Sequence, residues 1–292
     1  MLITCVSFAE QKPTLKRQKL LSRNGSKKDS SWKYRKRKRE SLTLNENTPN
    51  FLTLKLRYTT KVIKNMKCVN IYALCIKDEL EMPVSSYLNH FKSERQQSIQ
   101  SYRQLADQNR TVWAELLARY LLCNMIPATW SEISIERNLS GKPYVKTLKD
   151  EWQINLSHSG SWAICSIGRC NSGVDVEIET ADFEEIARHS FLPKEFSALQ
   201  IMPLSCRKKA FLCYWTIKES YLKYTGEGLT RNLSEVDCAE ILKGTKSIAG
   251  KNFLLPDGAV IGICTQRNCL PPHINFVSIS TLKNFLSKLD NI

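Results

Sequence analysis

Three short apolar segments follow one another between residues 152 and 179, and they constrain the fold more than any other part of the chain. They are WQINLS (152–157), WAICSIG (162–168) and GVDVEIE (173–179), with polar residues between them. Short runs bounded by turn residues and rich in β-branched and aromatic side chains are typical of strands. The linker RCNSG predicts a hairpin between the second and the third strand. Three consecutive strands require a sheet, so the chain must belong to a fold class that contains one.

Helical segments flank these strands on both sides. The clearest is DQNRTVWAELLARYLL (107–122), in which apolar residues recur at helical spacing. A second long helix is predicted over 207–224, ended by the glycines of TGEGL. Further helices are expected over 85–102 and from 183 onwards, and further strands over 66–76, 131–138, 259–266 and 273–280. The chain is therefore predicted to be an α/β (α+β) protein with two α/β halves, residues 66–172 and 173–292.

Composition restricts the class of protein further. The 292 residues include 42% hydrophobic ones, and no apolar run approaches the length of a membrane span. The amino terminus is apolar first and basic afterwards, which is the reverse of a secretory signal. The eleven cysteines include no Cys-x-x-Cys, and Cys75, Cys123, Cys165 and Cys213 stand in apolar contexts typical of buried thiols. We therefore expect a cytoplasmic protein with reduced cysteines, no structural zinc and no membrane contact.

The net charge of +15 is concentrated near the amino terminus. Residues 1–65 hold 17 Lys and Arg against 4 Asp and Glu, whereas residues 66–292 hold 26 against 24. The first segment has too little apolar surface to offset the entropy of ordering, so it is predicted to be a basic, disordered extension. Two interpretations of it stay open: an arm for nucleic acid or nuclear targeting, or an extension without function ahead of a domain that begins near Met66.

The third strand carries acidic residues at alternate positions. Asp175, Glu177 and Glu179 share one face of an extended GVDVEIE segment, and the residues between them, Ile178 included, share the opposite face, which is expected to be buried. Like charges on one strand face repel each other, so the arrangement favours a compensating cation. Magnesium prefers oxygen ligands and is usually shared between carboxylates and a substrate phosphate. The alternative for this strand taken alone is a solvated acidic face.

The second long helix adds to this acidic strand. Trp215, Glu219 and Lys223 are spaced i, i+4, i+8, so they share one helical face. An exposed Glu–Lys pair is the simpler explanation, but Trp215 favours a half-buried face, and Lys218 adds a cation beside the carboxylate. A third carboxylate and two lysines would complete a site for a metal and a phosphate.

The segment INLSHSG (154–160) contains His158, one of four histidines in the chain. Ser157 and His158 are sequence neighbours, whereas a serine hydrolase needs a spatial arrangement of nucleophile and base, so a hydrolase is disfavoured. His158 is expected either to contact a phosphate or base of a ligand, or to be a hydrogen-bonded turn residue.

The motifs GKP, NLSHSG, GVDVE, PKEF, WTIKESYLK and GEGL follow one another in this order. In this order and spacing, the chain resembles the 4′-phosphopantetheinyl transferase superfamily, and most of all its Sfp-type members, from about Met66 to the terminal strands. The resemblance implies a monomer whose two similar halves pack as a pseudo-dimer within one chain, with the active site in the groove between them. It also implies magnesium-dependent transfer of the 4′-phosphopantetheine arm of coenzyme A to a serine of an apo acyl or peptidyl carrier protein, with release of adenosine 3′,5′-bisphosphate. Fatty acid, polyketide and nonribosomal peptide synthesis all stay open as the pathway.

The resemblance also assigns roles to single residues. Asp175, Glu177 and Glu219 match the magnesium positions, Lys223 matches a lysine beside the pyrophosphate, and Glu219 is also a candidate base for the serine hydroxyl. The residues that match or lie near the binding site for the nucleotide end of coenzyme A are Arg95 and His158 at the 3′-phosphate, Lys142 and Ser157 at the nucleotide, Arg110 in the matching helix, and Lys218. The chain departs from the family pattern at Ser98, where some members carry a second lysine. Glu195 of PKEF fits an acidic family position without a role that the sequence explains.

Two alternatives from other classes use the same features. A magnesium nuclease would use the Asp, Glu and Lys residues to cut phosphodiesters while the basic arm holds the nucleic acid. Such sites usually place a lysine two residues after the glutamate on one strand, and VDVEIE lacks it. A nucleic-acid-binding protein dominated by its arm is the second alternative.

Overall fold

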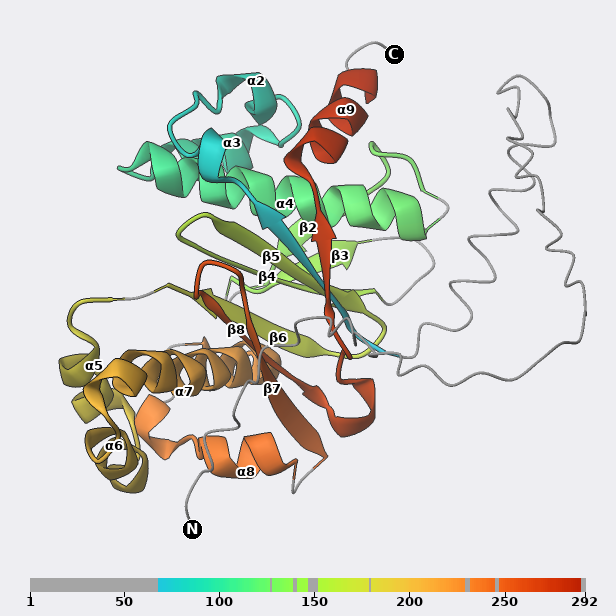
Figure 1. Cartoon of the computed structure of the whole chain (residues 1–292). Coiled ribbons are helices and arrows are strands. Elements are labelled where there is room, and N and C mark those ends of the chain that lie inside the picture. The colour runs from blue at the N-terminus through green and yellow to red at the C-terminus, as the bar shows by residue number, and fades with distance from the viewer. Residues whose placement is uncertain are drawn as a thin grey trace, which may run out of the picture. The chain divides into compact units, whose positions relative to one another are not determined.

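The computed structural model describes residues 68–126, 128–138, 141–146, 152–178, 180–228, 232–244 and 247–289 (Figure 1). The chain divides into two compact units, Met1–Asn45 and Glu46–Ile292, and every described residue belongs to the second. The predicted basic extension over residues 1–65, and Glu179, lie outside the described residues. The described part combines helices and sheets, so the expected mixed α and β class is confirmed.

The strands form two larger sheets and one small one. They are β1 (Asn70–Cys75), β2 (Ser134–Arg137), β3 (Pro143–Lys146), β4 (Gln153–Ser159), β5 (Trp162–Gly168), β6 (Ser172–Glu177), β7 (Ile248–Leu254), β8 (Val260–Gln266) and β9 (Ile274–Val277). The first sheet has the order β4-β5-β1-β9, in which only β9 runs parallel to its neighbour. The second sheet has the antiparallel order β6-β8-β7, and β2 pairs with β3.

Helices cover these sheets. They are α2 (Ser85–Leu88), α3 (Ser93–Gln100), α4 (Leu105–Met125), α5 (Phe183–Ser190), α6 (Pro193–Gln200), α7 (Leu204–Thr225), α8 (Cys238–Lys243) and α9 (Ile279–Leu289), with short 3-10 turns η1 (Lys77–Glu79), η3 (Leu233–Glu235) and η4 (Arg267–Cys269). Figure 1 shows α4 across the first sheet and α7 across the second, and each helix contacts the strands of its sheet. Among the helices in this part of the chain, none combines the length and apolar character that crossing a membrane requires.

Three clusters of buried side chains hold these layers together. The first packs α4 against the first sheet through residues such as Leu117 and Ile154. The second surrounds α7, with Phe211 near its start, and the third lies between the two sheets, with Ile71 and Val176 among its members. Removing apolar surface from water stabilises a fold by about 25 cal/mol per Å², so such clusters make the main favourable contribution to folding.

Two glycines allow α7 to lie directly on the second sheet. A Cβ atom at Gly173 would lie 2.0 Å from the carbonyl oxygen of Ser220, and one at Gly262 would lie 2.4 Å from that of Thr216. No real side chain fits so close to a backbone, so both positions need glycine. The close contact brings α7, which carries Glu219, against β6, which carries Asp175. The helix ends at Gly226 with a φ of 78°, which confirms the predicted stop.

The predicted hairpin over residues 162–179 is wrong. β5 pairs with β4 and β1, whereas β6 pairs with β8 in the other sheet. The hairpin is made instead by β4 and β5, which meet at Gly160 with a φ of 53°. The short linker after β5 carries the chain from one sheet to the next, and local turn residues do not encode which sheet receives a strand.

The end of the chain packs on the first sheet. β9 adds to the free edge of β1 in the first sheet, and α9, which the sequence did not predict, places Leu282 and Leu286 in the first core cluster. Residues after position 173 therefore contribute strands to both of the larger sheets. Ile178, expected in the core, is 41% exposed because β6 already ends at Glu177.

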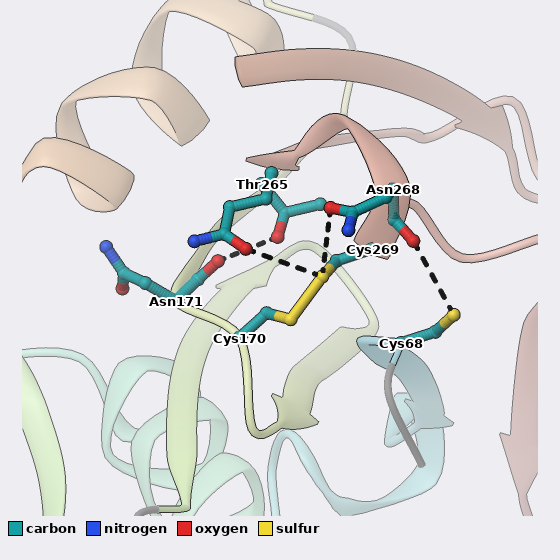
Figure 2. Close-up of a disulfide and its surroundings, with 7 residues drawn as sticks. Cys68, Cys170, Asn171, Thr265, Asn268 and Cys269 are labelled. Atoms are coloured by element: carbon teal, nitrogen blue, oxygen red, sulfur yellow. Dashed lines mark hydrogen bonds between the residues drawn. A yellow bond between two sulfur atoms is a disulfide. The ribbon is translucent and has the colours of Figure 1, made fainter. Parts of the chain in front are cut away.

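A disulfide corrects the expectation that all cysteines are reduced. Cys170, in the linker after β5, is bonded to Cys269 in η4, 99 residues later in the chain (Figure 2). The two segments are held side by side by the Thr265 hydroxyl, which donates to the Asn171 carbonyl at 2.7 Å. The other cysteines of the described residues are thiols, of which Cys165 is buried as expected, whereas Cys75 is exposed.

Candidate active site

A pocket of about 580 Å³ is lined by residues of α3, α4, β4, β6 and α7, together with the β2–β3 pair. Most residues that the sequence singled out line it. The lining consists of Arg95, Ser157, His158, Asp175, Glu177, Trp215, Glu219 and Lys223 from that set, and of Tyr102, Thr111, Ala114, Glu115, Arg137, Gly141, Pro143 and Leu156 besides. The spacing arguments for the acidic strand and for the long helix therefore converge on one cavity.

Asp175 lies at the buried end of this arrangement and is 3% exposed. Its Oδ1 accepts hydrogen bonds from the Lys223 ammonium at 2.7 Å and from the Ser157 hydroxyl at 3.0 Å. Its Oδ2 is buried without a hydrogen-bond partner in the described residues. A buried carboxylate oxygen without a partner is costly, so this atom marks a position where a cation would be favourable.

The other two carboxylates are destabilised in their charged form. Burial, and then the Asp175 carboxylate, raises the pKa of Glu177 to about 7, although the Ser159 hydroxyl donates to its Oε2 at 2.8 Å. Burial and Asp175, in the same order, also raise the pKa of Glu219. Positive charge added between these groups would relieve both effects.

The three carboxylates are the candidate ligands for the expected metal. Within the described residues, no group of three or more His, Cys, Asp or Glu side chains is arranged to hold a metal ion as the side chains stand. Lys223 forms its ion pair with Asp175. A simple surface pair would have joined it to Glu219 instead. The unpartnered Oδ2 of Asp175 and the all-oxygen character of the three carboxylates nevertheless fit a hard cation such as magnesium.

His158 lies on the same pocket wall and is neutral at pH 7. Burial, followed by the positive charges of Lys223 and Arg110, lowers its pKa to about 4. Its Nε2 lies 3.4 Å from the Thr111 hydroxyl. An anionic ligand near this ring would offset the nearby positive charges and favour the imidazolium form.

Two arginines share one carboxylate in the pocket wall. Arg95 donates from Nε and Nη2 to Oε1 of Glu115, at 2.9 and 2.5 Å, and Arg137 donates to the same oxygen from Nη2. Sequence reasoning found Arg95 but missed Glu115, Arg137 and the pocket residue Thr111. The signal for Glu115 was a carboxylate inside the apolar run of the 107–122 helix, since buried charges need partners.

Arg110 and Lys142 do not line the pocket. Arg110 donates to the Gly160 carbonyl at 2.8 Å and to Asp107 at 2.6 Å, so it braces the β4–β5 turn beside His158. The Lys142 ammonium donates to Asn171 at 2.8 Å, and burial lowers its pKa. Both lie near the site without facing it in this arrangement.

Lys218 differs most from its expected place. Its ammonium is fully buried and bonded to Glu195 Oε2 at 2.8 Å, to the Leu233 carbonyl at 3.0 Å and to the Val236 carbonyl at 2.5 Å. These contacts use all three N–H donors of a lysine, so none is left for a ligand. The expectation that Lys218 adds a cation beside Glu219 is therefore wrong. The contacts also explain Glu195, which is the buried partner of this lysine.

One pocket combines carboxylates and a lysine with arginines and a histidine, and this composition is typical of a site for a ligand rich in phosphate groups. Comparisons with known families agree. Residues 171–264 match the model of the 4′-phosphopantetheinyl transferase superfamily, and residues 81–168 match that of the 4′-phosphopantetheinyl transferase amino-terminal region.

Individual relatives carry the same name. The chain is 27% identical to the 4′-phosphopantetheinyl transferase psf-1 of Bacillus pumilus over 209 residues, which are 68% of this chain and 88% of that protein. It is 25% identical to the 4′-phosphopantetheinyl transferase Sfp of Bacillus subtilis over 205 residues, which are 67% of this chain and 91% of that protein. A 4′-phosphopantetheinyl transferase of Bacillus subtilis is 30% identical over 57% of this chain and 71% of its own length.

The chain belongs to the 4′-phosphopantetheinyl transferase superfamily, as its motifs indicated, and it is a transferase enzyme. The comparisons give no support to the nuclease and nucleic-acid-binding alternatives.

Proposed function

We propose that this enzyme transfers the 4′-phosphopantetheine arm of coenzyme A to a serine hydroxyl of an apo acyl or peptidyl carrier protein. The observation that carries the proposal is the single pocket in which Asp175, Glu177 and Glu219 lie with Lys223. Coenzyme A has a pyrophosphate and a separate 3′-phosphate, and the pocket lining contains three cationic side chains from different elements, Lys223 of α7, Arg95 of α3 and Arg137 of β2.

Each phosphate has a proposed partner among these groups. Lys223 binds the pyrophosphate beside the acidic residues. Arg95 and His158 bind the 3′-phosphate, and Ser157 contacts the nucleotide. Arg110 supports the β4–β5 turn, and Lys142 supports the β5–β6 linker through Asn171.

Asp175, Glu177 and Glu219 would hold the magnesium ion. When bound, the ion supplies positive charge that neutralises the pyrophosphate oxygens. Asp175 contributes the oxygen that lacks a partner among the described residues, and the raised pKa values of Glu177 and Glu219 would return toward their ordinary range.

Glu219 accepts the proton of the serine hydroxyl as general base. The serine oxygen forms a bond to the phosphorus that carries pantetheine, and the bond from that phosphorus to the bridging pyrophosphate oxygen breaks. Adenosine 3′,5′-bisphosphate leaves with the electron pair of that bond, and Lys223 stabilises the charge that develops on it.

We also propose how the two matched segments of the chain are arranged. The segments that match the two family models form two similar halves, packed as a pseudo-dimer with the pocket in the groove between them. The lining supports this, since α3, α4 and β4 belong to one matched segment and β6 and α7 to the other. The enzyme is proposed to act as a monomer in the cytoplasm, without nucleic acid.

A transfer assay tests the proposal. The full-length protein is incubated with coenzyme A, magnesium and a panel of apo carrier proteins, and intact-mass spectrometry follows each carrier. At least one carrier should gain one phosphopantetheine on its serine, and chelation of the metal should stop the gain. Absence of any gain over a panel from fatty acid, polyketide and nonribosomal peptide systems would contradict the proposal.

A further inference from the structure

Glu115 is a carboxylate in the part of the pocket where an anion is proposed to bind. Its side chain is 7% exposed and lines the pocket on α4. The proposed reaction gives it no role, and a negative charge there repels a phosphate. Burying a carboxylate there is costly, so we expect it to have a function that offsets this cost.

The contacts of Glu115 indicate what this function is. Its Oε1 receives two N–H groups of Arg95, which comes from α3, and one of Arg137, which comes from β2. Two guanidinium groups side by side repel each other, and both belong to long, flexible side chains. The shared carboxylate offsets this repulsion and fixes both groups in place through charge-assisted hydrogen bonds.

Each arginine keeps donors for a ligand. Arg95 also donates from Nη1 to the Ser98 hydroxyl at 3.0 Å, and Arg137 from Nη1 to the Gly141 carbonyl at 2.9 Å. A guanidinium has five N–H groups, so N–H groups of both arginines make no hydrogen bond to the described residues. The set carries two positive charges and one negative charge, which leaves a net positive site for a phosphate monoester that is close to a dianion at pH 7.

We propose that Glu115 is a positioning residue that holds Arg95 and Arg137 as a pair of guanidinium groups for the 3′-phosphate of coenzyme A. This inference rests on the proposed function, since it takes coenzyme A as the ligand. Arg137 is then a second contact for this phosphate, in the place of the lysine that some family members carry at the position of Ser98.

Three roles of Glu115 are possible: positioning the arginines, repelling the ligand, or stabilising the fold. They predict different effects of Glu115→Gln on the affinity for a 3′-phosphate. If Glu115 positions the arginines, the amide holds them less well, and affinity for a 3′-phosphate falls. If the carboxylate only repels the ligand, its removal raises that affinity. If Glu115 only stabilises the fold, ligands with and without the 3′-phosphate are affected equally.

Calorimetric binding to the full-length chain separates these outcomes. Adenosine 3′,5′-bisphosphate and adenosine 5′-monophosphate are titrated into the wild type and into Glu115→Gln. We expect binding of the bisphosphate to weaken by about tenfold, the loss of one charge-assisted contact, and binding of the monophosphate to stay unchanged. In transfer assays, the KM for coenzyme A should rise while kcat and the KM for dephospho-coenzyme A change less than about twofold.

Two further variants make the test specific. Glu136→Gln removes a neighbouring carboxylate that pairs with Lys146 at 3.5 Å outside the pocket lining, and it should leave both affinities unchanged. In an Arg95→Ala/Arg137→Ala background, Glu115→Gln should have almost no further effect on the bisphosphate, because it acts through the two arginines.

The possible failures are distinguishable. A wild type that neither binds the bisphosphate nor transfers phosphopantetheine contradicts the proposed function. A wild type that does both, with equal or tighter bisphosphate binding in Glu115→Gln, overturns the positioning role alone. Equal losses for bisphosphate and monophosphate, or a full effect of Glu115→Gln without the two arginines, overturn it as well.

Discussion

At the scale of single residues, the pocket keeps opposite charges close together where solvent screens them little. Asp175 has one oxygen bound to Lys223 and Ser157 and another without a partner in the described residues. Burial and the Asp175 carboxylate raise the pKa of Glu219, and the Lys223 ammonium offsets this only in part. Two carboxylates in one site therefore contribute to stability with opposite signs.

Glu219→Gln should abolish transfer without weakening the fold. The amide cannot accept the serine proton, so the rate should fall by about 100-fold or more. It also removes a buried charge that faces Asp175, so the melting temperature measured without metal should stay equal or rise. Asp175→Asn, in contrast, should lower the melting temperature, because Lys223 loses the partner of its 2.7 Å ion pair. Near-normal turnover of Glu219→Gln at saturating magnesium would exclude Glu219 from the site.

His158 predicts a pH dependence of stability in the absence of ligands. Its pKa is about 4 in the folded state, below the ordinary value of 6.5, because of burial and the nearby cations. Between these two values the unfolded chain binds a proton that the folded chain does not, so stability falls as the pH is lowered from about 6.5 to about 4. The full contribution is up to roughly 3 kcal/mol.

Denaturant unfolding at a series of pH values, for the wild type and for His158→Gln, measures this contribution. The variant should lose less stability than the wild type over this range, because it has no imidazole to protonate. Adenosine 3′,5′-bisphosphate should bind more tightly to the wild type as the pH is lowered in the same range, since the imidazolium favours the anion. Parallel pH profiles of the two proteins would show that His158 titrates normally.

At the scale of elements, the sequence predicted the long helices and most strands because their apolar residues repeat with the period of the structure. It predicted Glu219 and Lys223 in one cavity because residues four apart share a helical face. It failed for Lys218, because a shift of one residue turns the side chain by about 100° around the helix, toward α6 and η3. It also failed for the hairpin after β5, because pairing between strands depends on the whole sheet.

Lys218 and Glu195 join α6, α7 and the segment after η3, so they should determine stability and not ligand affinity. Glu195 also accepts hydrogen bonds from the backbone N–H groups of Leu192 at 3.1 Å and Cys238 at 2.9 Å. Lys218→Met leaves this carboxylate buried without its cation and should cost about 3–5 kcal/mol in denaturant unfolding.

The KM for coenzyme A of the folded Lys218→Met variant should stay unchanged, because the ammonium lies outside the pocket lining. Adding Glu195→Gln should recover part of the lost stability, since the unpaired charge is then removed. A large rise in the KM with little loss of stability would return Lys218 to the binding site.

At the scale of the whole molecule, the site depends on contacts between segments that are far apart in sequence. Arg137 of β2 donates a hydrogen bond to Glu115 of α4, and β9 pairs with β1. The Cys170–Cys269 disulfide joins two segments that are 99 residues apart. The sequence could not predict this disulfide, since eleven cysteines allow many pairings and reduced thiols were expected. In the described residues, the disulfide ties the β5–β6 linker to η4, and the Asn171–Thr265 hydrogen bond ties it to the end of β8 (Figure 2).

The last prediction concerns the basic segment of residues 1–65, which carries 17 Lys and Arg against 4 Asp and Glu. The family matches lie within residues 81–264, so a variant that begins at Met66 should fold and modify a carrier protein at close to the full-length rate at physiological salt. Coenzyme A is an anion, so the segment can speed its encounter with the enzyme at low ionic strength, and this gain should fade as the screening length shortens to about 8 Å. Measuring kcat/KM of both forms over a salt series tests this expectation. If the shortened form is insoluble or inactive at physiological salt, residues 1–65 are needed for the fold and the boundary near Met66 is wrong.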